Sequence, residues 1–208
     1  KRIQFTIKNV MHTDLLDQKL YNACIYLQCT ATALQGVPVE KLTELLPDIW
    51  KIIEDKSDYF EFPEDFLYQI GLIVNGNLPA LRPDIVGEYF VFDWLFEKRA
   101  KTIHDFILTI WKYPVLAAIF FERLIQDFGH LLNEFPERWD ILFTDSILSF
   151  KNASLYYSQY VLNATYYCNA VEQCEKLVSL LDKFVTRYPN NPEIAIAFAG
   201  SLFNLSNK

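Results

Sequence analysis

The chain has 208 residues, of which 51% are hydrophobic and 16% aromatic, and it carries a formal net charge of −7. Only 6 residues are glycine, which disfavours dinucleotide-binding folds and turn-rich all-β architectures, because both need glycine at positive φ or at close backbone approaches. The 17 Phe, 12 Tyr and 4 Trp bury enough apolar surface to exclude disorder. The composition therefore indicates a folded, mainly α-helical protein of one large domain or two small ones.

The charge balance and the cysteines narrow the classes of partner and site. No basic stripe that could neutralise a phosphate backbone is visible, so nucleic acid is not an expected partner. The four cysteines show neither CxxC spacing nor a histidine at zinc-ligand spacing, which favours buried reduced thiols over a metal site. Two uncharged stretches, 20–39 and 152–171, contain too many polar residues for membrane spans. Because no secretory leader is visible, we expect a cytoplasmic location.

Residues 13 to 56 predict three helices. Apolar side chains from residue 16 to residue 34 recur at steps of three and four, which marks one face of a helix. Gly36 is predicted to end this helix in the left-handed conformation, because glycine has no Cβ to clash there. Pro38 is predicted at the first position of a second helix, and Pro47 at the start of a third.

A β-hairpin is predicted next along the chain. Residues 69–74 and 77–82 flank Asn75-Gly76, and this dipeptide favours a type I′ turn, which needs positive φ at both central residues. Three helices followed by a hairpin is the order of a winged helix. Residues 1–100 are therefore interpreted as a winged-helix-like module.

The last element of this module is a linking helix over residues 83–98. Its sequence is apolar nearly all round, so we expect it to be buried as a spine. Glu88 and Asp93 interrupt the apolar run and lie five residues apart, on different faces of a helix. They are interpreted as contacts to solvent or to backbone rather than as an acid–base pair.

Residues 101–208 predict a succession of helices and are interpreted as a tetratricopeptide-like helical-repeat region, truncated at its C-terminal end. Helix starts near residues 153 and 192 are about 39 residues apart, which is in the range of such repeats. The predicted elements are a helix ending at Tyr113-Pro114, one ending at Gly129, one ending at Phe135-Pro136, an amphipathic segment over 137–150, a hairpin of 153–167 with 170–187, and a helix from Pro192.

Few residues point to catalysis or to cofactor binding. The three histidines are far apart in the sequence and lie in no metal-binding or catalytic motif. Gly71 and Gly76 have the spacing of a phosphate-binding loop, but Asn77-Leu78 follow where lysine and serine or threonine are needed. We therefore predict no catalytic residue, no cofactor and no metal site.

One aromatic cluster suggests a contact with another protein. Tyr156, Tyr157 and Tyr160 form a possible partner surface, because tyrosine is common in protein interfaces. Core packing between the helices explains the same residues equally well. The alternatives therefore stay open at this point.

Several of these features together resemble one family. The family is the STAND-class NTPases, signal-transduction ATPases that include the NACHT and NB-ARC proteins. In bacterial members an Ala-rich helix, a Gly-x-Pro step, a short hairpin and a PD-[IL]-[VL]-GE helix form a winged-helix module after the nucleotide-binding domain, with helical repeats beyond it. Here the Gly-x-Pro step is Gly36 and Pro38, and the last motif is Pro83, Asp84, Gly87 and Glu88.

The resemblance implies a non-catalytic regulatory or sensor fragment of a larger signalling ATPase. In the family the phosphate-binding loop and its lysine belong to an upstream domain, so the fragment itself is not expected to be an enzyme, although its parent is an NTPase. Arg82, Pro83 and Asp84 stand where relatives carry a Met-His-Asp triplet that senses ADP, so we expect no direct nucleotide contact. The repeats would bind protein, either the chain's own ATPase domain or a sensed protein ligand, in signalling or bacterial defence.

Two other functions are compatible with the sequence. The first is a free-standing helical-repeat interaction protein or effector with no ATPase attached. The second is a winged-helix DNA-binding regulator, which the charge disfavours: residues 38–56 hold three lysines against five acidic residues, a net charge of −2.

Overall fold

The computed structural model describes residues 17–57, 60–82, 84–98, 100–150 and 152–208. The protein is mainly α-helical, as predicted, with a small two-stranded antiparallel sheet. It divides into two compact units, residues 1–87 and 88–208, so the division falls inside helix α6 (Asp84–Glu97) rather than after it. None of the helices in the described ranges is long and apolar enough to cross a membrane.

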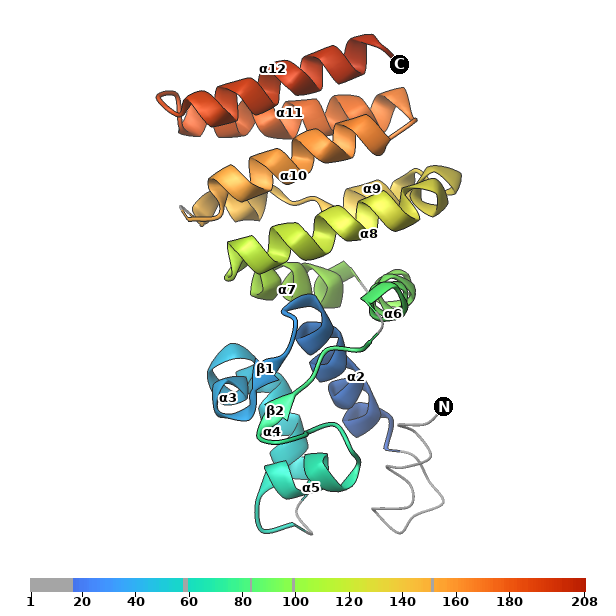
Figure 1. The fold of residues 1–208 in the computed structure, drawn as a ribbon, viewed down its shortest axis with the longest axis vertical. Coiled ribbons are helices and arrows are strands. Elements are labelled where there is room, and N and C mark those ends of the chain that lie inside the picture. The colour runs from blue at the N-terminus through green and yellow to red at the C-terminus, as the bar shows by residue number, and fades with distance from the viewer. Residues whose placement is uncertain (1–16, 58–59, 83, 99, 151) are drawn as a thin grey trace. The chain divides into compact units, whose positions relative to one another are not determined.

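The first unit has one long helix followed by shorter helices and the two strands (Figure 1). Its elements are α2 (Gln18–Ala33), β1 (Val37–Pro38), the 3-10 turn η1 (Val39–Lys41), α3 (Leu42–Leu45), α4 (Pro47–Lys56), α5 (Pro63–Gln69), β2 (Asn77–Leu78) and the first turn of α6. Val37 lies opposite Leu78 and Pro38 opposite Asn77. The sheet therefore joins segments that are about 40 residues apart in sequence.

Helix α2 begins at a side-chain cap. The Asp17 carboxylate accepts hydrogen bonds from the backbone N–H of Lys19 (2.9 Å) and of Leu20 (3.0 Å). It also lies 3.0 Å from Lys56 Nζ of α4. The hydrogen bond from Leu20, helped by Lys56, lowers the pKa of Asp17 below its ordinary value.

The end of α2 corrects the predicted role of Gly36. Gln35, with φ of 59°, takes the left-handed position, and Gly36 follows it at φ of 109°. Gly36 N–H donates to the Ala31 carbonyl (2.7 Å) and Gln35 N–H to the Thr32 carbonyl (3.3 Å), which is the Schellman pattern. The helix therefore ends one residue earlier than the glycine indicated.

The prediction that Pro38 begins a helix is wrong, whereas the prediction that Pro47 begins one is confirmed. Pro38 lies in β1 and precedes the 3-10 turn η1 instead of occupying the first position of a helix. Pro47 is the first residue of α4. Proline suits both places, because each needs its fixed φ and neither needs its missing N–H.

The turn at Asn75-Gly76 forms as predicted, but the flanking strands do not. Asn75 and Gly76 have φ of 52° and 74°, and Val74 and Asn77 exchange backbone hydrogen bonds of 2.8 and 3.1 Å. Residues 69–74 are not a strand, because α5 extends to Gln69 and the N–H groups of residues 72 and 73 donate to the Leu67 carbonyl at the helix end. Val74 and Asn77 form a single bridge across the turn. Apart from this bridge, the strand after the turn, β2, pairs with β1 and not with residues 69–74.

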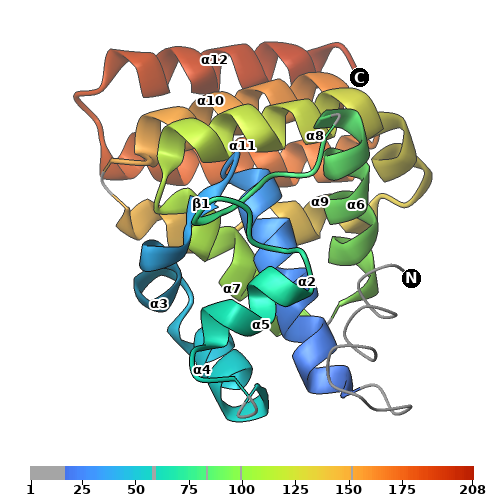
Figure 2. The ribbon, with the colours of Figure 1, turned by 60° about the horizontal axis from the view of Figure 1, so that its bottom comes forward.

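The second unit is a two-layer helical array (Figures 1 and 2). Helices α8, α10 and α12 pack side by side in one layer, and α7, α9 with η2, and α11 form the other. Beyond α6, the elements are α7 (Ala100–Trp111), α8 (Pro114–Glu134), α9 (Glu137–Leu142), the 3-10 helix η2 (Asp145–Ser149), α10 (Ser154–Tyr167), α11 (Val171–Arg187) and α12 (Pro192–Ser206). Each helix contacts its neighbours in the array, which is the packing of repeat proteins.

Several predicted helices are confirmed. Helices α10 and α12 begin at Ser154 and Pro192, which are 38 residues apart, and the Asn191 side chain caps the second of them. Helix α7 buries one complete apolar face. The buried residues of that face are Ile103, Phe106, Ile107, Ile110 and Trp111.

Two helix boundaries differ from the prediction. Gly129 does not end a helix, because α8 continues through it to Glu134. A Cβ on Gly129 would lie 3.6 Å from Tyr167 Cβ, an ordinary contact distance, so the packing of α8 on α10 leaves room for a side chain here. The segment 137–150 is not one helix but breaks at Thr144, whose N–H donates to Tyr157 Oη (2.8 Å) while the Tyr157 hydroxyl donates to the Thr144 carbonyl (3.0 Å).

Helix α6 is buried on fewer sides than its composition predicted. Trp94 is buried, as expected for a spine, and its ring packs edge-on against Phe106 at a centroid distance of 5.1 Å. Ile85, Val86 and Tyr89, however, are about half exposed. A helix that is apolar nearly all round exposes part of its surface when packing partners cover only one side of it.

Candidate binding groove

A groove of about 290 Å³ lies in the second unit between α9 with η2 and α11. It exists because α9 has 6 residues and η2 has 5, whereas the neighbouring α11 has 17 and extends past them. The lining residues are Trp139, Asp140, Phe143, Thr144 and Asp145 on one side, and Gln173, Lys176, Leu177, Leu180 and Lys183 on the other.

The floor of the groove is apolar and firmly supported. Leu177 and Leu180 are buried on α11. Phe143 stacks on Trp139 at 6.3 Å between ring centroids and on Tyr160 of α10 at 4.8 Å. Because Tyr160 supports Phe143 from behind, the floor has a fixed shape before any ligand binds.

Two ion pairs join the walls of the groove. Lys176 Nζ lies 3.0 Å from Asp140 Oδ2, and Lys183 Nζ lies 2.9 Å from Asp145 Oδ2. The hydrogen bond to Asp140, with the nearby carboxylate of Glu172, raises the pKa of Lys176 above its ordinary value. All four paired side chains are about half exposed, so each pair contributes little stability and exchanges readily with other charges.

One polar atom of the groove is left without a partner. Gln173 is 7% exposed, and its buried Oε1 accepts no hydrogen bond from the residues that the structure describes. Buried side-chain acceptors are nearly always paired, since leaving one unpaired costs about 1–3 kcal/mol. The Gln173 carboxamide is therefore a group of this groove whose hydrogen bonding is incomplete, with its Oε1 closed off from solvent in this conformation.

The predicted tyrosine surface is largely wrong. Tyr157 and Tyr160 are fully buried, and their rings pack against Trp111 at centroid distances of 4.8 and 5.8 Å. Burial raises the pKa of both hydroxyls well above the ordinary value. Of the three residues, only Tyr156 is exposed, so core packing explains the other two.

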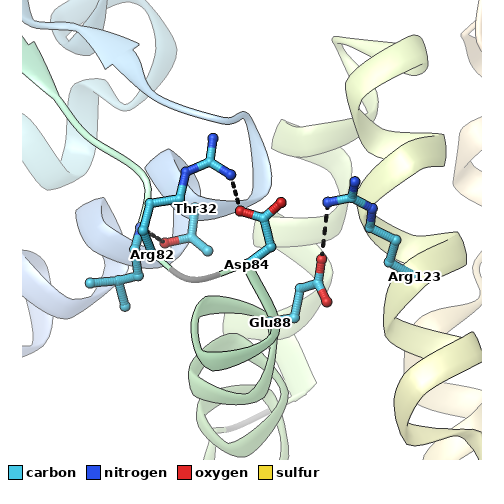
Figure 3. Close-up of polar contacts among 6 residues, drawn as sticks. Thr32, Arg82, Asp84, Glu88 and Arg123 are labelled. Carbon is cyan, nitrogen blue, oxygen red and sulfur yellow. Dashed lines mark hydrogen bonds and ion pairs between the residues drawn. The ribbon is translucent and has the colours of Figure 1, made fainter.

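The residues of the Pro-Asp-Gly-Glu motif that lie in the first unit are near α2 and the segment before α6 (Figure 3). Leu81 N–H donates to Thr32 Oγ1 of α2 (3.3 Å), and a Cβ on Gly87 would lie 2.8 Å from Thr32 Cγ2. Asp84 forms an ion pair with Arg82. Pro83 lies outside the described residues. Glycine at position 87 thus lets the first turn of α6 approach α2 closely.

Glu88, the last residue of the motif, is buried in the second unit. Its Oε1 lies 3.5 Å from Arg123 Nη1 of α8 (Figure 3). Desolvation, with a hydrogen bond to Asp127, raises the pKa of Glu88, and the Arg123 charge offsets only part of this effect. This carboxylate thus contacts neighbouring side chains, rather than the solvent or backbone expected for it, whereas Asp93 is exposed as expected.

The cysteines have the character of core residues, as predicted. Cys24, Cys29, Cys168 and Cys174 are all buried and free. Burial raises the pKa of Cys24 to about 12 and that of Cys168 to about 11, so both are protonated thiols at neutral pH. In the described ranges, no three potential metal ligands come together.

The groove residues were missed by the reasoning from sequence. Gln173, Lys176, Leu177, Leu180 and Lys183 lie at steps of three and four along one face of α11. This pattern is ordinary for an amphipathic helix. The available signal was Thr144-Asp145, a helix-capping pair inside an apolar run, which marks the break that opens the groove.

Comparisons with models of known protein families, with curated proteins and with solved structures found no match. The resemblance to the STAND-class NTPases therefore depends on the residues quoted above. Any functional assignment depends on those residues and on the geometry of the groove.

Proposed function

We propose that the chain is a non-catalytic protein-interaction module whose helical array binds an extended segment of a partner protein in the groove between α9, η2 and α11. The observation that carries this proposal is an apolar floor flanked by two exchangeable ion pairs, with the Gln173 carboxamide, whose Oε1 is unpartnered, at one end of the groove. A peptide supplies all three complements: a backbone N–H, an apolar side chain and charged side chains.

The dimensions of the groove suit a short peptide. From Gln173 to Lys183 the lining face of α11 is about 15 Å long, at about 1.5 Å per helical residue. An extended chain advances about 3.3 Å per residue, so four or five residues cover this length. Gln173 Oε1 is closed off from solvent in the free chain, so the carboxamide turns on binding to accept a hydrogen bond from a peptide N–H. An apolar side chain of the peptide contacts Leu177 and Leu180.

The regulatory part of the proposal follows the family resemblance. In it, the chain belongs to a larger, cytoplasmic STAND-like signalling ATPase, and residues 1–100, which include the first unit, form its winged-helix-like module. The order of helix, strand, helices, turn and strand in this unit supports that interpretation. Partner binding to the array then shifts the ATPase between its inactive and active states. The size of the shift is set by how much more tightly the partner binds one state than the other.

Peptide selection followed by substitution of Gln173 tests the binding site. Random 12-residue peptides displayed on phage are selected on the 208-residue chain, and the affinities of enriched peptides are measured by fluorescence polarisation. Gln173→Leu is expected to weaken them by about tenfold, because it removes an acceptor for the peptide N–H. The variant keeps its stability, since the free chain leaves that acceptor unpaired.

Glu175→Leu is the matched control, because Glu175 is exposed on the same helix but outside the groove. It introduces the same side chain and should leave peptide affinity unchanged. Peptides that bind equally well to the Gln173→Leu variant, or a selection that enriches no peptide, would contradict the proposal.

A separate observation decides between a STAND-like regulator and a free-standing interaction protein. A GxxxxGK[ST] motif encoded upstream of Lys1 in the same reading frame is expected for the regulator. Titration calorimetry of the 208-residue chain with ATP and with ADP should detect no binding. Micromolar affinity for either nucleotide would contradict the placement of nucleotide contacts in another domain.

A further inference from the structure

Asn75 is the only asparagine of the chain that is followed by glycine. Asparagine is thermolabile, because the backbone nitrogen of the next residue attacks its side-chain carbonyl carbon. Glycine in that next position favours the attack, since it has no Cβ to obstruct the approach. Asn75 and Gly76 are both exposed at the turn before β2, where water and hydroxide reach them. The turn therefore carries a residue pair that is prone to deamidation.

Both polar atoms of the peptide group that joins Asn75 to Gly76 are hydrogen-bonded. The Gly76 N–H donates to the Tyr68 hydroxyl of α5 (2.9 Å). The Asn75 carbonyl accepts a hydrogen bond from the side-chain amide of Asn77 (3.0 Å). For the attack, the nitrogen has to lose its proton and the peptide group has to turn toward Asn75 Cγ. These two hydrogen bonds hold the peptide group back from both changes.

We propose that Asn75 is a site of spontaneous deamidation and that Tyr68 sets its rate. Hydroxide removes the proton of the Gly76 N–H once this group leaves the Tyr68 hydroxyl. The nitrogen then forms a bond to Asn75 Cγ, the bond from Cγ to Nδ2 breaks, and the amide nitrogen takes a proton from water and leaves as ammonia. Water opens the resulting succinimide ring at either carbonyl group, which yields aspartate or isoaspartate.

The isoaspartate product changes the backbone of the turn. Its main chain runs through the side-chain carbon, which inserts an additional carbon atom between residues 75 and 76. Asn75 and Gly76 have φ of 52° and 74°, and a turn of this kind depends on standard backbone geometry at both residues. The Gly76 carbonyl also accepts a hydrogen bond from the N–H of Val39, directly after β1 (3.0 Å). The product is therefore expected to weaken the pairing of β1 with β2.

Mass spectrometry of the aged protein tests the proposal. The 208-residue chain is incubated at mildly alkaline pH, and deamidation is followed in the tryptic peptide 57–98, whose only asparagines are Asn75 and Asn77. Tyr68→Phe should raise the rate at Asn75 by about 2- to 10-fold, the factor that corresponds to one ordinary hydrogen bond. In concentrated urea the native and variant chains should deamidate equally fast, because the hydrogen bond is absent there. Asn77, which precedes leucine in the same turn, should react much more slowly than Asn75.

Ile53→Val separates the loss of this hydrogen bond from a general loss of stability. Ile53 is fully buried in α4, and removing one of its carbon atoms lowers stability by about as much as the loss of a hydrogen bond. The Gly76 N–H keeps its partner in this variant, so the rate at Asn75 should stay near the native rate. Circular dichroism verifies that both variants are folded.

Thermal denaturation of the deamidated chains tests the effect on the turn. Ion-exchange chromatography separates these chains from the native chain by their additional negative charge. The isoaspartate form should melt at a lower temperature than the native chain. Asn75→Asp is the matched control, because it adds the same charge without the additional backbone carbon, and it should melt like the native chain.

Four results would overturn the proposal. Equal rates at Asn75 in the native and Tyr68→Phe chains would mean that the hydroxyl does not control the attack. An Ile53→Val chain that deamidates as fast as the Tyr68→Phe chain would mean that the reaction requires unfolding of the whole unit. Deamidation of Asn77 at the rate of Asn75 would remove the role of glycine. An isoaspartate form that melts like the native chain would show that the turn tolerates the longer backbone.

Discussion

Gly87 is a position where the absence of one methyl group determines a helix contact. A Cβ there would lie 2.8 Å from Thr32 Cγ2 and 2.9 Å from the Leu81 carbonyl oxygen. The second atom belongs to the backbone and cannot rotate away. We expect Gly87→Ala to lower the free energy of unfolding by about 1–3 kcal/mol, the usual cost of overpacking, measured by urea denaturation at neutral pH.

Gly129→Ala is the control for this substitution. Gly129 is also helical, but its Cβ would meet Tyr167 Cβ at 3.6 Å, an ordinary contact distance. Alanine there should leave stability unchanged or raise it by up to about 1 kcal/mol, because it loses less backbone entropy than glycine. An equal loss at both positions would show that close approach is not what makes Gly87 necessary.

The raised pKa of Glu88 predicts that the stability of the protein depends on pH. Desolvation, assisted by the hydrogen bond to Asp127 and opposed by Arg123, raises its pKa in the folded chain above the ordinary value of 4.5. The folded state therefore holds a proton that the unfolded state has lost, and stability falls as pH rises through the folded pKa. Glu88→Gln should gain stability relative to the native chain over this range and match it below pH 4.5.

Denaturation curves at several pH values from mildly acidic to neutral check this expectation. Asp93→Asn, on the same helix but exposed, is the control and should show no such trend. A difference between Glu88→Gln and the native chain that is constant with pH would mean that the Glu88 carboxyl has the same pKa in both states.

At the scale of elements, helix α6 carries some apolar residues that are buried and others that are exposed. Trp94 is 5% exposed and packs against Phe106, whereas Ile85 is about half exposed. Trp94→Ala is expected to cost about 3–5 kcal/mol, because it leaves a large cavity. Ile85→Ala should change stability by no more than about 0.5 kcal/mol. Thermal and urea denaturation of both variants measure the difference, and similar effects would contradict the assignment of the two faces.

Helices with a sustained apolar period were predictable from sequence, and their ends were less so. Ile103 to Trp111 mark the buried face of α7, and Pro192 marks the start of α12. Gly129 was misinterpreted as a helix end because a glycine inside a helix has the same appearance in a sequence as a glycine that ends one.

The β-structure shows a different limit. Asn75-Gly76 determines its own turn, because the positive φ values are a local property of the two residues. The strand partner is not local. Val37 and Leu78 are 41 positions apart, and no feature of either short segment indicates the other. The groove has the same origin, since Gln173 becomes significant only where α11 lies beside the break at Thr144.

At the scale of the whole molecule, composition already predicted a mainly helical protein, and the array of residues 88–208 agrees with it. Aromatic content did not indicate which rings would be exposed. Tyr156 and Tyr157 are adjacent, yet the first lies on the surface and the second contacts Trp111 in the core. Burial of this kind depends on the layer that covers a helix, which the sequence of that helix alone does not contain.

The one-sided packing of α12 has a kinetic consequence. In a linear array each helix is stabilised mainly by its neighbours, and α10 has helices on both sides whereas α12 contacts α10 and α11 through one face. The array therefore opens in a defined order. Hydrogen–deuterium exchange should be faster for the amides of α12 than for those of α10. Equal exchange rates in the two helices would show that the array opens as one cooperative unit.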